Sequence, residues 1–201
     1  MHLNFKHTKI NNKKVEKGLS LIESAMVLAL AATVTAGVMF YYQAASDSNK
    51  TQSAISEVMS ATSAINGLYI GQNGYTGLDA NVLKNSSAIP DNYKTTNGIS
   101  NPFGGALNVG AAGTSAQNAF GYYIELTNLP KSACISLATL NLGTSAVGYG
   151  IGVNNPSGSS NFGADLTSGT PKKTNITPAE AADLTKGCKD GSENKVAYFM
   201  K

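Results

Sequence analysis

One uninterrupted apolar segment constrains this chain more than any other feature of its sequence. From Leu19 to Tyr42 the segment has 24 residues and only one charged residue, Glu23. As a helix it would be about 36 Å long, which exceeds the roughly 30 Å hydrocarbon core of a bilayer. We therefore expect a helix that can span a membrane.

Glu23 is out of place in such a segment. A carboxylate only four residues into an apolar helix costs about 2.5 to 3.5 kcal/mol on membrane-insertion scales, and more when it lacks a partner. Charged residues in this position are functional more often than structural. The sequence therefore marks Glu23 as a candidate functional residue that needs a positively charged partner.

The residues around this segment resemble the amino-terminal signature of type IV pilins. The resemblance rests on Gly18, the apolar run that follows it and Glu23, and the leucine at position 19 with its 18-residue leader is similar to the type IVb branch. It implies that a prepilin peptidase/methyltransferase cuts between Gly18 and Leu19, that Leu19 is then N-methylated, and that Glu23 acts in assembly. Residues 136–146 and the ending at 198–201 also resemble this branch, so the similarity reaches both ends of the chain.

The resemblance implies an α+β fold, in which a long N-terminal helix packs on a globular head with a mainly antiparallel sheet and one disulfide. It implies a homo-oligomeric filament that serves adhesion, bundling and microcolony formation. The expected partners are the peptidase, the inner-membrane pilus assembly machinery, the inner membrane before assembly and a host-cell surface receptor. The precursor is expected in the inner membrane and the mature chain in an extracellular fimbrium.

Four parts are expected along the chain. Residues 1–18 form a basic leader that is removed, and residues 19–42 form the transmembrane and polymerisation helix. Residues 43–70 continue the helix in amphipathic form, and residues 71–201 form the head. The amphipathic face is predicted from apolar residues at helical spacing, namely Ile55, Val58, Met59, Ile65, Leu68 and Tyr69, with Gly71 and Gly74 ending the helix.

The charges of the chain support this division. Five of the 15 lysines precede Gly18, and lysines ahead of a first apolar helix hold that end on the cytoplasmic side. Without the leader, ten lysines face eleven acidic residues, and the chain has no arginine. The electrostatic footprint of a nucleic-acid-binding protein is therefore missing, and no nucleic-acid partner is expected.

The head is predicted to begin with a long loop. Residues 71–119 are rich in Gly, Asn, Ser and Thr, so they are expected to form loop and turns, with a short helix near 79–83. The first core strand is expected at residues 120–127 and a helix at residues 131–140 after Pro130. In residues 147–153 glycine alternates with larger residues, which places the glycines on one face, beneath that helix.

The C-terminal part of the head has two clear signals. Thr177-Pro-Ala-Glu180 is a capping-box pattern with proline at the first helical position, which predicts a short helix to about Lys186. Residues 195–201 are apolar and strand-like, and the type IV pilin resemblance implies that this strand lies within the sheet. The turn-rich residues 154–174 are expected on the surface.

The two cysteines are interpreted as a structural pair. In a chain exported from the cytoplasm, Cys134 and Cys188 favour a disulfide over a catalytic or metal-binding pair, with two buried free thiols as the alternative. Both histidines, His2 and His7, lie in the leader, so the mature chain has no imidazole for a catalytic triad or a zinc site. No catalytic residue, metal site or cofactor is expected.

Other functions share parts of this pattern. An ordinary secretory signal would be cut after the apolar run, for example at residues 29–31 or 33–36, and an uncleaved signal anchor would be retained. A type II secretion pseudopilin has the same architecture as a type IV pilin. A membrane-anchored periplasmic binding protein or enzyme is the alternative from a different class.

Overall fold

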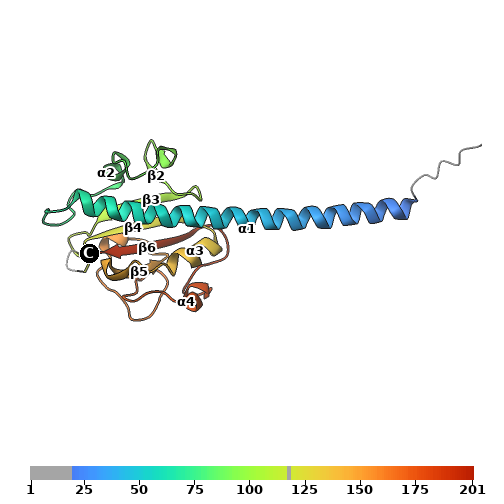
Figure 1. Cartoon of the computed structure of the whole chain (residues 1–201). Helices are drawn as coiled ribbons and strands as arrows, with labels where there is room; N and C mark the ends of the chain where they lie inside the picture. The colour runs from blue at the N-terminus through green and yellow to red at the C-terminus, as the bar shows by residue number, and fades with distance from the viewer. Residues whose placement is uncertain (1–19, 117–118) are drawn as a thin grey trace, which may run out of the picture. The chain divides into compact units, whose positions relative to one another are not determined.

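The structure is a computed structural model that describes residues 20–116 and 119–201. Its helices and strands (Figure 1) are, in chain order, α1 (Leu21–Leu68), α2 (Ala80–Lys84), η1 (Asp91–Tyr93), β1 (Lys94–Thr95), β2 (Gly98–Ser100), β3 (Ala106–Ala111), β4 (Tyr122–Leu129), α3 (Lys131–Ala138), η2 (Gly143–Ser145), β5 (Ala146–Ile151), η3 (Pro156–Gly158), α4 (Pro178–Ala182) and β6 (Asn194–Met200). The described residues form two compact units, one ending at Gln43 and the other comprising Ala44–Lys201.

The helix α1 is continuous over 48 residues, about 72 Å at the standard rise. This confirms the expected long N-terminal helix. It ends at Leu68, and Gly71 follows with φ at 78°, a left-handed conformation that glycine adopts without steric cost.

The buried face of α1 differs from the predicted one. Its buried residues are Ala54, Glu57, Val58, Ala61 and Ile65. Met59 and Leu68, which were predicted to face the core, are 58% and 50% exposed. The prediction gave weight to large apolar side chains, whereas the small alanines at 54 and 61 are among the residues that α1 buries.

The six strands form one antiparallel sheet in the order β1-β2-β3-β4-β6-β5. In its centre, Ile124 of β4 lies opposite Val109 of β3 and Tyr198 of β6. The C-terminal strand β6 is therefore an interior strand, as the type IV pilin resemblance implied. The fold is α+β, with a long helix and an antiparallel sheet as expected.

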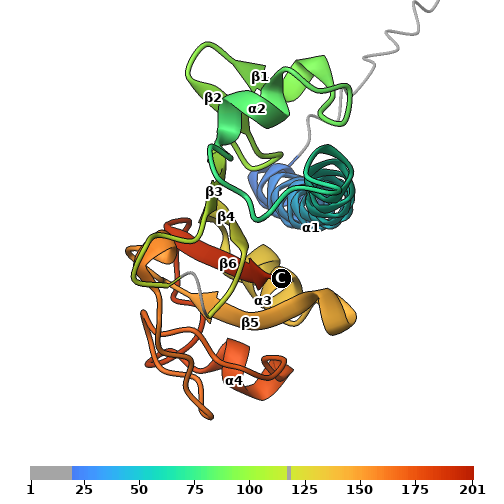
Figure 2. The same cartoon turned by 90° about the vertical axis from the view of Figure 1, so that its left-hand side faces the viewer.

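One face of the sheet carries the main core. Side chains of β3, β4 and β6, including Leu107, Ile124 and Tyr198, pack there with the buried residues of α1 and with Leu137 of α3. Within the unit Ala44–Lys201, α1 and α3 lie on the same side of the sheet (Figure 2). The hydroxyl of Tyr198 donates to the backbone carbonyl of Leu137 at 2.7 Å, which fixes α3 on this face.

The opposite face is covered by loops and has a second, smaller core. Phe199 of β6 packs there edge to face against Phe120 and Phe162. Gly148 of β5 lies directly under Phe162, and an added Cβ would clash with that ring. The glycines of β5 are therefore beneath this aromatic cluster and not beneath α3, which corrects the expectation from the sequence.

The segment between α1 and β4 holds more structure than predicted. The helix expected near residues 79–83 is present as α2, but β1, β2 and β3 also form within the predicted loop. Strand β4 is consequently not the first core strand, because β3 pairs with it over five residues from Leu107 to Ala111. The sequence of β3, Ala-Leu-Asn-Val-Gly-Ala, has only two large apolar residues, so its intrinsic strand signal is weak.

Candidate processing and assembly site

Two of the three residues expected to act in processing and assembly, Gly18 and Leu19, lie outside the described residues. Glu23 is described and lies in the first turn of α1. Its carboxylate accepts a hydrogen bond from the backbone N–H of Ser20 at 2.9 Å. That N–H has no partner within the helix, and a negative charge at a helix N-terminus is favourable. Glu23 is thus held close to the start of its own helix.

No salt bridge joins Glu23 to any residue within 20–116 or 119–201. The cationic partner that its apolar setting calls for is therefore absent from this part of the chain. The amine that the expected cleavage would free at Leu19 is outside the described residues. The geometry shows the carboxylate only as a cap of its own helix.

The first half of α1 is an exposed apolar surface. Leu21 is 90% exposed and Tyr41 is 77% exposed, and the large apolar side chains between them are exposed as well. By length and composition, the helix is able to cross a membrane. Soluble monomeric proteins rarely expose so large an apolar patch, so this surface needs lipid or protein to cover it.

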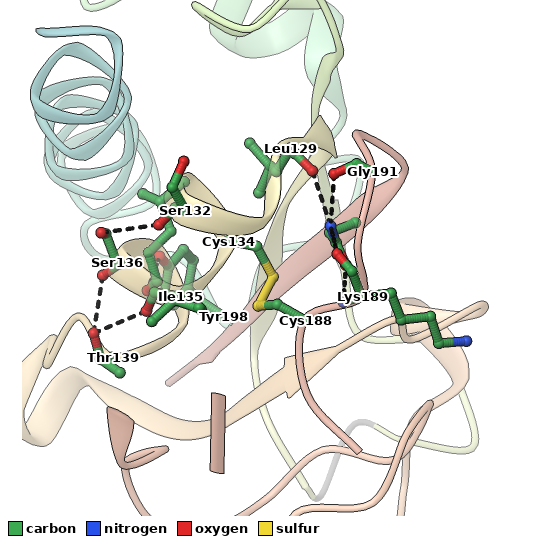
Figure 3. Close-up of a disulfide and its surroundings, with 12 residues drawn as sticks. Leu129, Ser132, Cys134, Ile135, Ser136, Thr139, Cys188, Lys189, Gly191 and Tyr198 are labelled. Atoms are coloured by element: carbon green, nitrogen blue, oxygen red, sulfur yellow. Dashed lines mark hydrogen bonds between the residues drawn. A yellow bond between two sulfur atoms is a disulfide. The ribbon is translucent and has the colours of Figure 1, made fainter. Parts of the chain in front are cut away.

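The disulfide predicted between Cys134 and Cys188 is present (Figure 3). Both cysteines are fully buried, and their Cα atoms are 5.9 Å apart. Cys134 belongs to α3 and Cys188 to the loop that precedes β6, so the bond fastens this loop to the helix on the main core face. It is remote in sequence from the exposed part of α1.

Asn194, which the sequence did not single out, organises the same loop. Its side-chain amide donates to the carbonyls of Leu129 and Lys189 at 3.1 and 3.0 Å, and its oxygen accepts from the N–H of Lys189 at 2.7 Å. These bonds join the loop after Cys188 to the end of β4 (Figure 3). No local motif signals them, because the partners are five and 65 residues away.

A buried ion pair was also missed. The Lys172 ammonium lies 2.7 and 2.9 Å from the two carboxylate oxygens of Glu180, and the lysine is only 7% exposed. Glu180 also completes the predicted capping box with Thr177 at the start of α4. The hydrogen bond from Lys172, followed by that from the Thr177 backbone, lowers the pKa of Glu180 from 4.5 to about 2. The helix itself is shorter than predicted and ends at Ala182.

The third residue that was missed is Glu57, a carboxylate on the buried face of α1. It is 4% exposed, and burial raises its pKa from 4.5 to about 8. The periodicity of the large apolar residues gave no sign of it. The spacing of Ala54, Val58 and Ala61 would have placed Glu57 on the same face.

Comparisons with known proteins fit this architecture. Residues 43–200 match the Bundlin family. Two proteins described as the major structural subunit of bundle-forming pilus, from Escherichia coli O111:H- and from Escherichia coli O127:H6 (strain E2348/69 / EPEC), are each 66% identical to the chain over 196 residues. In both comparisons 96% of this chain and 99% of the relative are covered.

A solved structure supports the fold. The type IV b pilin from Salmonella typhi aligns with 77% of this chain and 99% of its own, at a TM-score of 0.50 and 16% sequence identity. At that identity the likeness concerns the fold alone. Together with the family match and the two relatives, it shows that the chain belongs to the Bundlin family and has the type IV pilin fold.

Proposed function

We propose that this chain is the major structural subunit of a type IVb pilus of the bundle-forming kind. The observation that carries the proposal is the 66% identity, over nearly the whole length, to two proteins that bear this description. The structure adds a physical reason: the first half of α1 is apolar and exposed, so it must be covered. The activity of the chain is assembly, without catalysis or cofactor.

Each of the four expected parts of the chain acts at a stage of processing, membrane insertion or assembly. Residues 1–18 are the leader, cut from Leu19 by the prepilin peptidase/methyltransferase, which methylates the new terminus. Residues 19–42 hold the precursor in the inner membrane and later pack with equivalent helices of neighbouring copies. Residues 43–70 continue the helix, and residues 71–201 form the head displayed on the extracellular fimbrium. The assembly machinery moves the subunit from one state to the other.

Glu23 guides this transfer. In the free chain its carboxylate caps its own helix through Ser20, an arrangement that leaves acceptor capacity on the second oxygen. An incoming copy brings the charged amine of Leu19 into an apolar helix bundle, where an opposite charge offsets a desolvation cost of several kcal/mol. A helix displaced by one turn leaves both charges unpaired, so the pair sets the axial register.

Adhesion, lateral bundling, microcolony formation and contact with a host-cell receptor are the roles of the assembled pilus in this proposal. Head surfaces carry them, because the apolar helices are covered inside the filament. The support for these roles is the similarity to the two bundle-forming pilus subunits.

The experiment compares three strains that each express one pilin: wild type, Glu23→Val and Thr33→Val. Thr33 is a matched control, since its hydroxyl bonds only to the Leu30 carbonyl of its own helix. We expect all three chains to be inserted and to begin at Leu19 by intact mass, with filaments absent only from Glu23→Val. Normal filament yield from Glu23→Val would remove Glu23 from assembly.

The processing step has its own test. Replacing Gly18 with leucine should leave the uncut precursor in the inner membrane, since a side chain at this position hinders close approach of the peptidase. Mass spectrometry of the membrane fraction measures the result. Chains that still start at Leu19 would show that the cleavage site lies elsewhere.

A further inference from the structure

Among the acidic residues in the described part of the chain, only Glu57 has a buried carboxylate without a hydrogen-bond partner. Both of its carboxylate oxygens are inaccessible to solvent, and neither accepts a hydrogen bond from the residues described. Glu125, the other buried glutamate, accepts a bond from the Asn108 amide at 2.9 Å. A buried acid without any partner is costly when it is ionised.

The helical spacing tells which flank of α1 carries Glu57. Ala64 and Leu68 are seven and eleven residues further on and so lie on the same stripe of the helix. These two residues line a groove of about 490 Å³ with Ser86–Ala88, in the segment that follows α2. Ile55 lies on the other flank, where it lines a groove with Ser132 and Ser136 of α3. Glu57 is therefore on the side of α1 that faces the segment between α1 and β3.

The charged groups of the elements packed around α1 are engaged elsewhere. Lys131 of α3 pairs with Asp190, Lys94 pairs with Asp91, and Lys84 donates to the Thr96 carbonyl. The titratable side chains of the main core face are tyrosines, namely Tyr69, Tyr75, Tyr93, Tyr122, Tyr149 and Tyr198. Asp79 is the N-cap of α2, and besides Glu57 the helix α1 carries Glu23, Tyr41, Tyr42, Asp47 and Lys50. Lys50, the one lysine of α1, is exposed and lies seven residues away, about 10 Å along the axis. None of the described lysines forms a salt bridge with Glu57.

Because burial raises the pKa of Glu57 to about 8, the folded chain holds this carboxyl as a neutral acid at pH 7. In the unfolded or opened chain the same group ionises near its ordinary value of 4.5. The folded state therefore binds an extra proton between these values. Its stability is undiminished below pH 4.5, falls as the pH rises, and reaches its lower limit above about pH 8.

We propose that Glu57 is a proton-linked latch in the unit Ala44–Lys201. In the neutral form it allows the C-terminal part of α1 to stay packed against the sheet, and its ionisation loosens that packing. The head is then firmest in mildly acidic solution and loosest in mildly alkaline solution. The device belongs to the fold of the head and does not depend on the proposed role of Glu23 in assembly.

The composition of the mature chain makes this latch measurable. The only histidines are His2 and His7 of the leader, and the two cysteines are joined in the disulfide. Lysines and tyrosines titrate near pH 10 or above in their ordinary state. The mature chain thus has no imidazole or free thiol, the side chains that ordinarily titrate near neutral pH, and a Glu57 variant separates the titration of Glu57 from that of the terminal amine.

The experiment is amide hydrogen exchange of the full mature chain in detergent, followed in peptides of residues 54–65 and corrected for the intrinsic pH dependence of exchange. Wild-type protection should fall by about tenfold to a hundredfold between pH 6 and 9. In Glu57→Gln it should be nearly constant. Glu125→Gln, which alters a buried glutamate that has a partner, should keep the wild-type pH dependence.

The same pH dependence in wild type and Glu57→Gln would overturn the proposal. If Glu57→Gln does not fold, Glu57→Met serves in its place, because an apolar side chain of similar length suits the buried position. The wild type alone provides a second readout by carboxyl ¹³C NMR. One side-chain carboxyl that titrates above pH 7 supports the latch, and titration of every carboxyl below pH 6 refutes it.

Discussion

Replacing either member of the ion pair between Lys172 and Glu180 should destabilise the head, and by unequal amounts. The side chain of Lys172 is 9% exposed and that of Glu180 is 26% exposed. Glu180→Gln leaves a buried ammonium without a counter-ion, whereas Lys172→Met leaves a carboxylate that still reaches water and the Thr177 backbone N–H. The glutamate substitution should therefore be the more harmful.

The magnitudes follow from the geometry. At face value, the fall of the Glu180 pKa from 4.5 to about 2 equals roughly 3 kcal/mol in favour of the carboxylate. Solvent screening of its exposed quarter reduces this to about 1 to 2 kcal/mol, which is the loss expected for Lys172→Met. Breaking a buried pair so that one charge is stranded costs about 3 to 5 kcal/mol. We expect about 3 kcal/mol for Glu180→Gln, since the flexible lysine can move toward solvent.

The assay is urea unfolding of the mature chain in detergent at pH 7, followed by the near-ultraviolet circular dichroism of its nine tyrosines. Gln at position 180 can still complete the capping box, so the substitution isolates the charge. Lys173→Met is the matched control, because Lys173 is exposed and should change the unfolding free energy by less than about 0.5 kcal/mol.

The pH dependence gives a second check. Since the pKa of Glu180 is lower in the folded chain than in the unfolded chain, its stabilisation is present above pH 4.5 and is lost as the pH falls toward 2. Wild type should approach Glu180→Gln over that interval. The reasoning is refuted if Glu180→Gln is as stable as wild type at pH 7, or if Lys172→Met is the less stable of the two variants.

Three further changes test other parts of the head. Replacing Cys134 and Cys188 with serine should leave membrane insertion intact but lower the unfolding free energy by about 4 kcal/mol, seen as degradation of the subunit before it reaches the surface. Gly148→Ala forces a methyl group against Phe162 and should cost about 1 to 3 kcal/mol in urea unfolding. Tyr198→Phe removes the buried hydrogen bond to the Leu137 carbonyl and should cost about 1 kcal/mol, and an unchanged unfolding midpoint would contradict the contribution of this bond.

Sequence reasoning succeeded where a local pattern has one physical solution. A long apolar run can only be a helix in lipid or in a bundle, and the Thr177-Pro-Ala-Glu180 pattern begins a helix wherever it is exposed. The disulfide followed from two cysteines in an exported chain.

Features that depend on distant partners were not predictable in this way. Strand β3 is stabilised by pairing with β4, and its small residues carry little strand preference of their own. Lys172 and Asn194 have the composition of surface residues, and only the packing of separate segments buries them. Glu57 was missed because the predicted buried face was drawn through the large residues Ile55 and Met59, which lie beside the face that is buried.

The position of β6 in the sheet determines when the sheet can be completed during protein synthesis. The ribosome releases Asn194–Met200 after the other five strands, yet this strand lies between β4 and β5. Until it emerges, β4 lacks a neighbour on one side and β5 has no strand to pair with. A nascent chain therefore cannot complete this sheet strand by strand in sequence order, and a premature stop before Asn194 removes the strand that joins β5 to the rest of the sheet. Formation of the six-stranded sheet thus requires synthesis through β6.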